Sequence, residues 1–284
     1  MKFTRRAILI ASSTLLACPS FTQEKLKSLL QYEKETGGRI GLYALNLSTG
    51  ALIQWRAHER FVMCSTFKAS LAACVLKRVD QGQSKLEDLI SYDSSDLLDY
   101  APIAKFNLDK GALSLRELCK ASVELSDNTC ANLLLAHIGG PPALTDFWRS
   151  LNDKVSRLDH NEPALNRSRP GDFEDTTTPA AMVSNLKNLL FGNTLSDDSR
   201  KYLTEWLIGC KTGENRLRAG LPKNWSIGDK TGNNGSDAAG DIAVAWSEQG
   251  VPWIISAYTQ GGTPTPAKID MVFKEIGILI KEQL

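Results

Sequence analysis

Two residues that can act together as nucleophile and base stand three positions apart, at Ser65 and Lys68 in the tetrapeptide STFK. Residues at positions i and i+3 share one face of a helix, and the run that follows has helical spacing of apolar residues. A neutral lysine there could take the serine proton, and a helix N-terminus favours negative charge near the serine. We therefore predict a serine nucleophile at Ser65, and we interpret a second copy of the pattern at 184–187 as coincidence.

A second polar group, Ser126-Asp127-Asn128, lies between two stretches with helical spacing. Ser and Asp are favoured helix N-caps, so the simplest interpretation is that this tripeptide begins the following helix. A site is compatible with that interpretation if Asp127 caps the helix while Ser126 and Asn128 face the nucleophile.

A third group, Lys230-Thr231-Gly232, ends a predicted strand over 225–231 and precedes a glycine-rich turn. Its glycine would let a ligand approach the backbone closely. The same tripeptide occurs at 211–213, directly after a predicted helix, where lysine and glycine are typical of a helix C-terminus. We therefore assign the site to the copy at 230–232.

In this order and in these helix, loop and strand contexts, the three groups resemble the signature of class A β-lactamases and penicillin-binding proteins. A fourth segment, Glu162 to Asn166, reads EPALN and is similar to the E-x-x-L-N segment of the class A β-lactamase Ω loop. The resemblance covers essentially the whole chain after residue 17. It implies that family's fold, an all-α lobe set against an α/β sandwich.

The resemblance also implies a mechanism, acyl transfer followed by hydrolysis. Ser65 would attack the β-lactam carbonyl, and the N–H groups of Ser65 and Asn233 would form the oxyanion hole. Ser126 would pass a proton to the lactam nitrogen. Glu162 would activate a water that Asn166 helps to hold. The base for acylation stays open between Glu162 and the lysine of the first group.

Substrate recognition should follow charge, because β-lactams carry a carboxylate and one end of the pocket must be cationic. Lys230, Thr231 and Gly232 would form part of that end. Many class A enzymes place an arginine on the next strand, where this chain has Ala239. Arg216 resembles the arginine that other members use instead, with a solvated surface arginine as the alternative.

Two further residues complete the implied pocket. Asn128 would hydrogen-bond the acylamide side chain of the substrate. Tyr100 resembles the aromatic residue that forms the wall of the entrance, with a half-buried core tyrosine as the alternative.

The Ω loop departs from the family pattern. Its usual arginine is replaced by His160, although the partner Asp175 is present. A histidine–aspartate pair weakens when the imidazole is neutral. We therefore predict a looser loop, unless Arg157, Arg167 or Arg169 substitutes.

The cysteines, at positions 18, 64, 74, 119, 130 and 210, include no C-x-x-C. Cys64 resembles a cysteine that class A carbapenemases bridge to one after K-T-G, which is absent here. The other common family disulfide would join Cys119 to position 72, which is alanine. Cys74 is two residues away, about 200° around a helix. We therefore expect buried free thiols.

The first 17 residues read as an export signal, because basic residues at 2, 5 and 6 precede an apolar run at 7–17. Residues 4–9 approximate a twin-arginine pattern. Residues 15–18 resemble a bacterial lipobox, which would make Cys18 the lipidated N-terminus of a membrane-tethered chain. The alternative is an ordinary signal peptide that contains a cysteine.

Hydrophobic periodicity predicts the elements that must position these residues. We predict an α+β fold, in which an antiparallel five-stranded sheet is flanked by N- and C-terminal helices and an all-α lobe is inserted. The α/β lobe comprises 24–60 plus 211–284, and the all-α lobe comprises 61–210 with the Ω loop at about 157–177. The predicted strands are 39–46, 51–56, 225–231, 240–248 and 252–259, and the predicted helices are 24–36, 65–80, 114–124, 128–138, 142–151, 178–190, 196–209 and 266–283.

Composition excludes other classes of function. The 284-residue chain has 33 Lys+Arg against 32 Asp+Glu, which gives no electrostatic reason to expect a nucleic-acid partner. Its three histidines show no metal-ligand spacing, so we expect no metal ion or other cofactor. We expect a monomeric enzyme, exported to the bacterial periplasm, with β-lactam antibiotics as substrates. A D-Ala-D-Ala carboxypeptidase and a β-lactam sensor that stays acylated are the alternatives, and the Glu162 segment counts against both.

Overall fold

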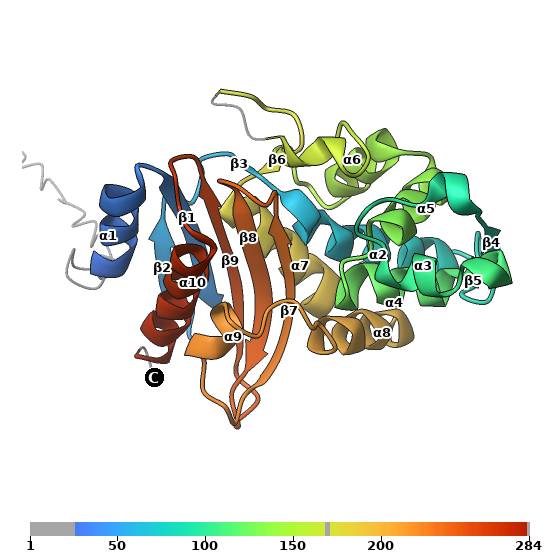
Figure 1. Ribbon diagram of the computed structural model, residues 1–284. Helices are drawn as coiled ribbons and strands as arrows, with labels where there is room; N and C mark the ends of the chain where they lie inside the picture. The colour runs from blue at the N-terminus through green and yellow to red at the C-terminus, as the bar shows by residue number, and fades with distance from the viewer. Residues whose placement is uncertain (1–25, 168–170, 283–284) are drawn as a thin grey trace, which may run out of the picture.

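The computed structural model describes residues 26–167 and 171–282 (Figure 1). The predicted export signal at 1–17, the lipidation candidate Cys18 and the Ω-loop residue Arg169 lie outside the described residues. Within the ranges described, we find no helix that is both long enough and apolar enough to cross a membrane.

A five-stranded antiparallel sheet forms one half of the molecule, in the order β2-β1-β9-β8-β7. The two ends of the chain meet in the pair β1–β9, so the predicted α+β fold with a five-stranded sheet is confirmed. β7 is an edge strand, and its free side faces the helical lobe (Figure 1). The strands are β1 (Arg39–Asn46), β2 (Leu52–Trp55), β7 (Ser226–Asn233), β8 (Ala239–Trp246) and β9 (Pro252–Gln260).

Both faces of the sheet are buried, because successive residues of a strand point to opposite sides. On one face, Ile255 of β9 joins an apolar cluster with the two terminal helices, α1 (Lys27–Thr36) and α10 (Pro266–Lys281). On the other face, Ile254 and Tyr258 belong to the large core that the helical lobe shares. Figure 1 shows α1 and α10 together on the side of the sheet away from that lobe.

The second lobe is built around α2 (Phe67–Asp80), whose first ten residues are all buried. Alanines in this helix let neighbouring helices pack close to its axis, and α4, α5 and α8 all contact it. The other helices are α3 (Pro102–Phe106), α4 (Leu115–Glu124), α5 (Asn128–Ile138), α6 (Pro141–Ser150), α7 (Pro179–Phe191), α8 (Asp197–Ile208) and α9 (Leu217–Gly220), with short 3-10 turns η1 (Cys64–Thr66), η2 (Ser94–Asp96), η3 (Leu108–Lys110) and η4 (Ala164–Asn166).

Short elements were not predicted, because two to five residues show no measurable periodicity. They include α3, α9 and two small sheets, in which β3 (Phe61–Val62) pairs with β6 (Thr176–Thr177) and β4 (Leu89–Ser91) pairs with β5 (Ala112–Ser114). The β3–β6 pair matters for function, since it joins the segment before the predicted nucleophile to the end of the Ω loop.

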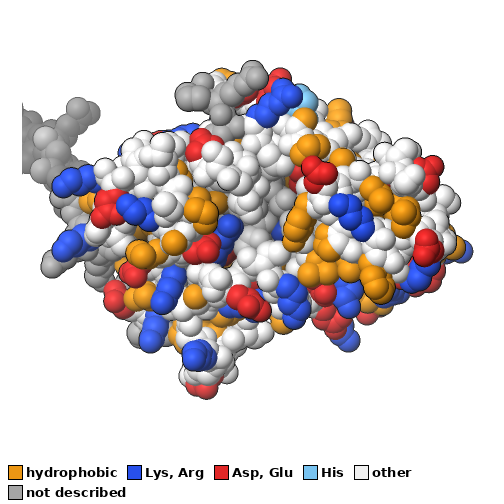
Figure 2. Space-filling model, in the orientation of Figure 1, with side chains coloured by type: hydrophobic (Ala, Val, Ile, Leu, Met, Phe, Trp, Pro, Cys, Tyr) orange, Lys and Arg blue, Asp and Glu red, His pale blue; other side chains and the backbone are white. Residues whose placement is uncertain are grey.

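The surface carries both signs of charge. Figure 2 shows Lys and Arg side chains interspersed with Asp and Glu over the face drawn, in keeping with a formal net charge of +1. The exact division of the chain into lobes at residues 60 and 210 stays a prediction.

Candidate active site

Ser65 lies in the turn η1, directly before α2, and lines a cleft between the two lobes. The preceding residue, Cys64, has a φ of 45°, a left-handed conformation that non-glycine residues adopt rarely. Such strain persists where the surroundings hold it. Here Cys64 is fully buried, and the N–H of Met63 donates to the carbonyl of Asp175 at 3.0 Å. The turn therefore presents Ser65 at a helix N-terminus in a fixed position.

Lys68 lies one turn farther along α2, and its side chain is fully buried. Its Nζ is 3.0 Å from Glu162 Oε1 and donates to Ser126 O at 2.8 Å and to Asn128 Oδ1 at 2.5 Å. Burial lowers the pKa of Lys68, while the negative charge of Glu162 opposes that shift. A lowered pKa makes the neutral, proton-accepting amine more accessible.

Ser126 stands on the opposite wall, in the loop that leads into α5. The carboxylate of Asp127 caps α5 by accepting the N–H of Cys130 at 2.9 Å, and it also accepts two N–H groups of α3. Ser126 itself has a φ of 61°. The tripeptide therefore has both of its predicted roles, because Asp127 caps the helix while Ser126 and Asn128 line the cleft.

Lys230 connects β7 to this loop. Its fully buried Nζ donates to Ser126 Oγ at 3.1 Å and to Thr231 O at 2.7 Å. Burial lowers the pKa of Lys230 to about 8, and the nearby charge of Lys68 acts in the same direction. The cleft thus has a cation beside the hydroxyl of Ser126.

Glu162 lies against the nucleophile, with Oε1 3.1 Å from Ser65 Oγ and Oε2 accepting from Asn166 Nδ2 at 2.5 Å. Its backbone is held by Asn132 of α5, which accepts the N–H and donates to the carbonyl of Glu162, both at 2.9 Å. The sequence analysis missed Asn132. Its position four residues after Asn128, on the same helix face, was the signal that could have found it.

The cleft has a volume of about 340 Å³. A carbon added at Gly232 Cα in the place of Cβ would lie 2.7 Å from Ser65 N, so glycine lets β7 approach the nucleophile turn this closely. Tyr100 stands at the rim and is 52 % exposed. A larger groove, of about 720 Å³, lies between α1 and α10 and is lined by none of the predicted site residues that the structure describes. The cleft is lined by Ser65, Tyr100, Ser126, Asn128, Asn166, Thr212, Thr231, Gly232 and Asn233.

The second copies of the S-x-x-K and K-T-G motifs differ in where they lie relative to the cleft. Ser184 and Lys187 are exposed on α7, as expected for a coincidental copy of the first pattern. The extra K-T-G at 211–213 does follow a helix, yet its Thr212 lines the cleft, with Oγ1 2.5 Å from Thr231 Oγ1. Sequence analysis missed Thr212, because only the packing of this segment against β7 brings the two threonines together.

Arg216 lies behind β7 and is 9 % exposed. Its Nη1 donates to Gly232 O at 3.0 Å and to Gly240 O at 2.9 Å, and its Nε donates to Asp270 Oδ1 at 3.1 Å. Among the residues that the structure describes, Arg216 is not one of those that line the cleft. It is therefore no solvated surface arginine, and the structure places it next to the predicted site.

Comparison with known proteins agrees with this geometry. Residues 22–284 match the family model described as the Beta-lactamase enzyme family. The chain is 44 % identical to β-lactamase Toho-1 of Escherichia coli over 251 residues, which are 88 % of this chain and 85 % of that protein. Its structure is similar to that of an ancestral class A β-lactamase of Gram-negative bacteria, with a TM-score of 0.88 and 48 % sequence identity. The match covers 92 % of this chain and 100 % of the ancestral chain. The chain belongs to the class A β-lactamases.

Other class A and related β-lactamases support the same assignment. β-Lactamase L2 of Stenotrophomonas maltophilia is 45 % identical over 246 residues, 86 % of this chain and 81 % of that protein. A β-lactamase structure from Xanthomonas campestris has a TM-score of 0.88 at 44 % identity and covers 91 % of this chain and 97 % of that chain. The predicted family, the α+β fold and the activity of a serine β-lactamase are therefore confirmed.

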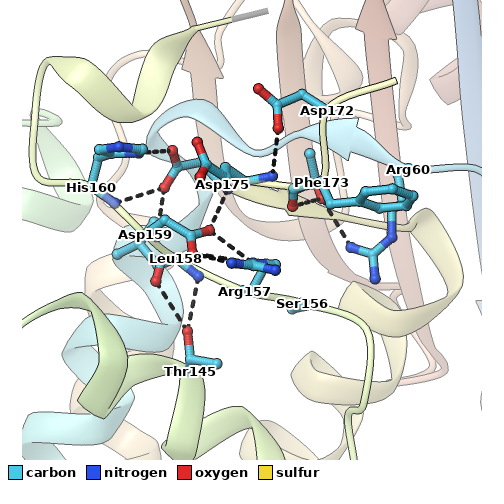
Figure 3. Close-up of polar contacts among 12 residues, drawn as sticks. Arg60, Thr145, Ser156, Arg157, Leu158, Asp159, His160, Asp172, Phe173 and Asp175 are labelled. Atoms are coloured by element: carbon cyan, nitrogen blue, oxygen red, sulfur yellow. Dashed lines mark hydrogen bonds and ion pairs between the residues drawn. The ribbon is translucent and has the colours of Figure 1, made fainter. Parts of the chain in front are cut away.

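In this class A β-lactamase the Ω loop is closed by reciprocal contacts between its two ends (Figure 3). Asp175 Oδ1 accepts the N–H groups of Asp159 and His160 at 2.8 and 3.0 Å, and Asp159 Oδ2 accepts the N–H of Asp175 at 3.0 Å. His160 Nδ1 donates to Asp175 Oδ2 at 2.7 Å, and Arg157 pairs with Asp159. The predicted histidine–aspartate pair is thus present, and Arg157 supports it indirectly through Asp159.

His160 gives the loop a pH dependence that an arginine would not. The hydrogen bond to Asp175 raises the pKa of His160 above its usual value. Because the pKa of His160 is higher in the folded state, the His160–Asp175 pair contributes its full stabilisation of the folded state below the unfolded pKa of about 6.5. That stabilisation is lost as the pH rises through the folded-state pKa of His160.

We expect His160→Arg to match the wild type in loop stability at pH 5.5 and to exceed it at pH 9, by less than about 1 kcal/mol because the pair is partly exposed. Hydrogen exchange of residues 158–167 and 171–176 at both pH values measures this difference, with Lys201→Arg, an exposed position on α8, as a control away from the loop. A difference that stays constant with pH would contradict the expectation.

The five cysteines in the described part of the chain are free and buried, as predicted: Cys64, Cys74, Cys119, Cys130 and Cys210. Burial raises the pKa of the Cys64 thiol, so this neighbour of the nucleophile is held as the unreactive thiol.

Proposed function

We propose that this enzyme hydrolyses the β-lactam amide of penicillins and cephalosporins through an acyl-enzyme on Ser65, and that it confers resistance to these antibiotics. The observation that carries the proposal is the contact of Glu162 Oε1 with both Ser65 Oγ, at 3.1 Å, and Lys68 Nζ, at 3.0 Å. A carboxylate against the nucleophile can activate water for hydrolysis of the acyl ester, whereas a sensor that stays acylated needs no such group.

In acylation, the Ser65 oxygen forms a bond to the lactam carbonyl carbon and the C–N bond of the ring breaks. The serine proton goes to Glu162, whose Oε1 lies 3.1 Å from the hydroxyl, or to Lys68, whose Nζ lies 3.0 Å from that same carboxylate oxygen. The N–H groups of Ser65 and Asn233 stabilise the oxyanion. Ser126, which accepts a hydrogen bond from Lys230, passes a proton to the leaving nitrogen.

In deacylation, Glu162 takes a proton from a water that attacks the acyl carbon. The ester bond to Ser65 then breaks, and Glu162 returns the proton to the Ser65 oxygen, 3.1 Å away. Asn166 positions this water, and its amide already donates to the Glu162 carboxylate at 2.5 Å. Because Asn132 holds the backbone of Glu162 on both sides, the carboxylate keeps its place through both half-reactions.

Substrate binding uses the rest of the cleft. Lys230, Thr231 and Gly232 bind the β-lactam carboxylate, with the charge of Arg216 behind them. Asn128 forms a hydrogen bond with the acylamide side chain of the substrate, and Tyr100 forms the wall of the entrance. We add Thr212 to this set, since its hydroxyl meets that of Thr231 at the carboxylate end.

A chromogenic cephalosporin at catalytic enzyme concentration tests the function. We expect many turnovers for each enzyme molecule. A single stoichiometric burst would instead indicate a sensor, and turnover only of D-Ala-D-Ala peptides would indicate a carboxypeptidase.

We further propose export to the bacterial periplasm, removal of residues 1–17 and lipidation of Cys18, on the sequence patterns alone. The mature protein would then be a membrane-tethered monomer. Mass spectrometry of the protein from cells is expected to show a diacylglyceryl-modified N-terminal Cys18. An unmodified chain that starts after Cys18 would contradict the lipid anchor, and it would leave the enzymatic proposal intact.

A further inference from the structure

Arg216 makes contacts that a residue serving only to attract a carboxylate would not need. It donates to two backbone carbonyls, of Gly232 and Gly240, and to the carboxylate of Asp270. Its guanidinium carbon also lies 5.4 Å from the ring centroid of Phe273 on α10. The side chain is therefore fixed from several sides, with its Nε and Nη1 donors engaged behind the edge strand.

One of those carbonyls belongs to the peptide that follows Gly232. In a planar trans peptide, the C=O of one residue and the N–H of the next point in opposite directions. Since the carbonyl of Gly232 points to Arg216 Nη1, the N–H of Asn233 points away from Arg216. That direction is the free side of the edge strand β7, where Asn233 lines the cleft.

The same peptide is close to the nucleophile turn. The Cβ position of Gly232 would be 2.7 Å from Ser65 N, so β7 passes directly beside the other donor of the proposed oxyanion hole. A rotation of this peptide would move the Asn233 N–H relative to the Ser65 N–H. The edge strand β7 has a neighbouring strand, β8, on one side only. Backbone hydrogen bonds to other strands therefore restrain the rotation of this peptide less than they would in a central strand.

We propose that Arg216 is a positioning residue of the oxyanion hole, which acts by holding the carbonyl of Gly232 so that the N–H of Asn233 points at the reacting carbonyl. This inference rests on the proposed acyl-enzyme mechanism and assigns Arg216 a part in transition-state stabilisation beyond attraction of the substrate carboxylate. The cationic donor also polarises the peptide, because a hydrogen bond to its C=O strengthens the bond that its N–H can donate.

The surroundings of Arg216 hold it in this position. Asp270 of α10 accepts from Nε, and Asp241 of β8 accepts the N–H of Leu217, the next residue along the chain, at 3.1 Å. Asp241 lies opposite Thr231 in the β7–β8 register and is fully buried. The backbone and the side chain of this segment are thus both tied to the sheet that carries the oxyanion peptide.

The test compares a penicillin with its methyl ester, which keeps the reacting carbonyl and lacks the carboxylate charge. For Arg216→Met, we expect kcat to fall about 10- to 100-fold on both substrates, somewhat less than when an oxyanion donor is removed outright. If Arg216 acts only by contact with the carboxylate, the variant will raise KM for the penicillin and leave the ester unaffected, which would overturn the proposal.

A second variant and a matched control complete the design. Arg216→Lys keeps the positive charge but cannot span both carbonyls and Asp270, so we expect reduced kcat on both substrates; wild-type kcat on both would overturn the proposal. Arg200→Met is the control, because Arg200 also donates to two backbone carbonyls, of Gly192 and Leu195, outside the cleft.

A spectroscopic measurement separates positioning from a general loss of stability. In a Glu162→Gln background, which should accumulate the acyl-enzyme, the ester carbonyl stretch reports on the oxyanion hole. We expect Arg216→Lys to shift this band to higher frequency, towards that of an unpolarised ester, and an unshifted band would overturn the proposal. If neither this parent nor the wild-type enzyme forms an acyl-enzyme, the proposed function fails instead.

Discussion

Glu162→Ala is expected to acylate and then stop. The variant should form a penicilloyl adduct on Ser65 and lose steady-state turnover by about 10³-fold or more, because a positioned general base contributes about 10²–10⁴. The reason lies in the geometry: Oε1 of Glu162 is 3.1 Å from Ser65 Oγ, and Asn166 stands at its other oxygen. Intact-mass spectrometry after mixing with a penicillin would detect the adduct.

Glu174→Ala is the matched control for this experiment, since Glu174 is an exposed carboxylate in the same Ω loop. We expect it to turn over normally. A Glu162→Ala enzyme that hydrolyses penicillin at the native rate would refute the role assigned to Glu162.

Lys68→Met is expected to have two large effects. The acylation rate should fall by about 10²–10⁴ if Lys68 is the base. The fold should also lose about 3 kcal/mol or more, because removal of one partner of a buried ion pair leaves the other charge uncompensated. Both partners of this pair, Lys68 and Glu162, have fully buried side chains. Stopped-flow acylation and thermal unfolding measure the two effects.

The two variants together decide which residue is the base for acylation. If Glu162→Ala still acylates quickly while Lys68→Met does not, Lys68 is the base; a larger loss of acylation rate in Glu162→Ala than in Lys68→Met would identify Glu162. The double variant Lys68→Met/Glu162→Gln should regain stability without regaining acylation, because neither member of the buried pair then carries a charge. Lys187→Met, in the exposed copy of the same motif on α7, serves as the control and should leave both quantities unchanged.

Much of the fold was predictable because its elements are long and periodic. The strand over 39–46 has its predicted bounds, and the helix at the C-terminus begins at the predicted residue. The boundaries near the site were less accurate. The helix predicted from residue 65 begins with a 3-10 turn at Cys64, and the strand predicted to end at 231 continues to Asn233. In both places tertiary contacts, not local periodicity, set the end of the element.

The site was predictable in part. Residues within short motifs, such as Ser65 with Lys68, share a helix face, so their proximity follows from local geometry. Asn132 and Thr212 escaped prediction, because each reaches the site through a contact with a segment distant in sequence: Asn132 with Glu162, and Thr212 with Thr231. Nothing local distinguishes Thr212 from other polar residues after a helix, whereas the place of Asn132 four residues after Asn128, on the same helix face, was a local signal.

By itself, the sequence determined the chemistry of this protein: a serine with a lysine one turn away, a capped loop with a second serine, a lysine on a strand and a glutamate in a long loop. Those features depend on residue type and short spacing. The tertiary structure decided how the features act together. It set Lys230 against Ser126, 104 residues apart, closed the Ω loop through Asp159 and Asp175, and placed Arg216 against the carbonyl of Gly232. Such contacts depend on how the lobes and sheet edges pack, which no local pattern encodes.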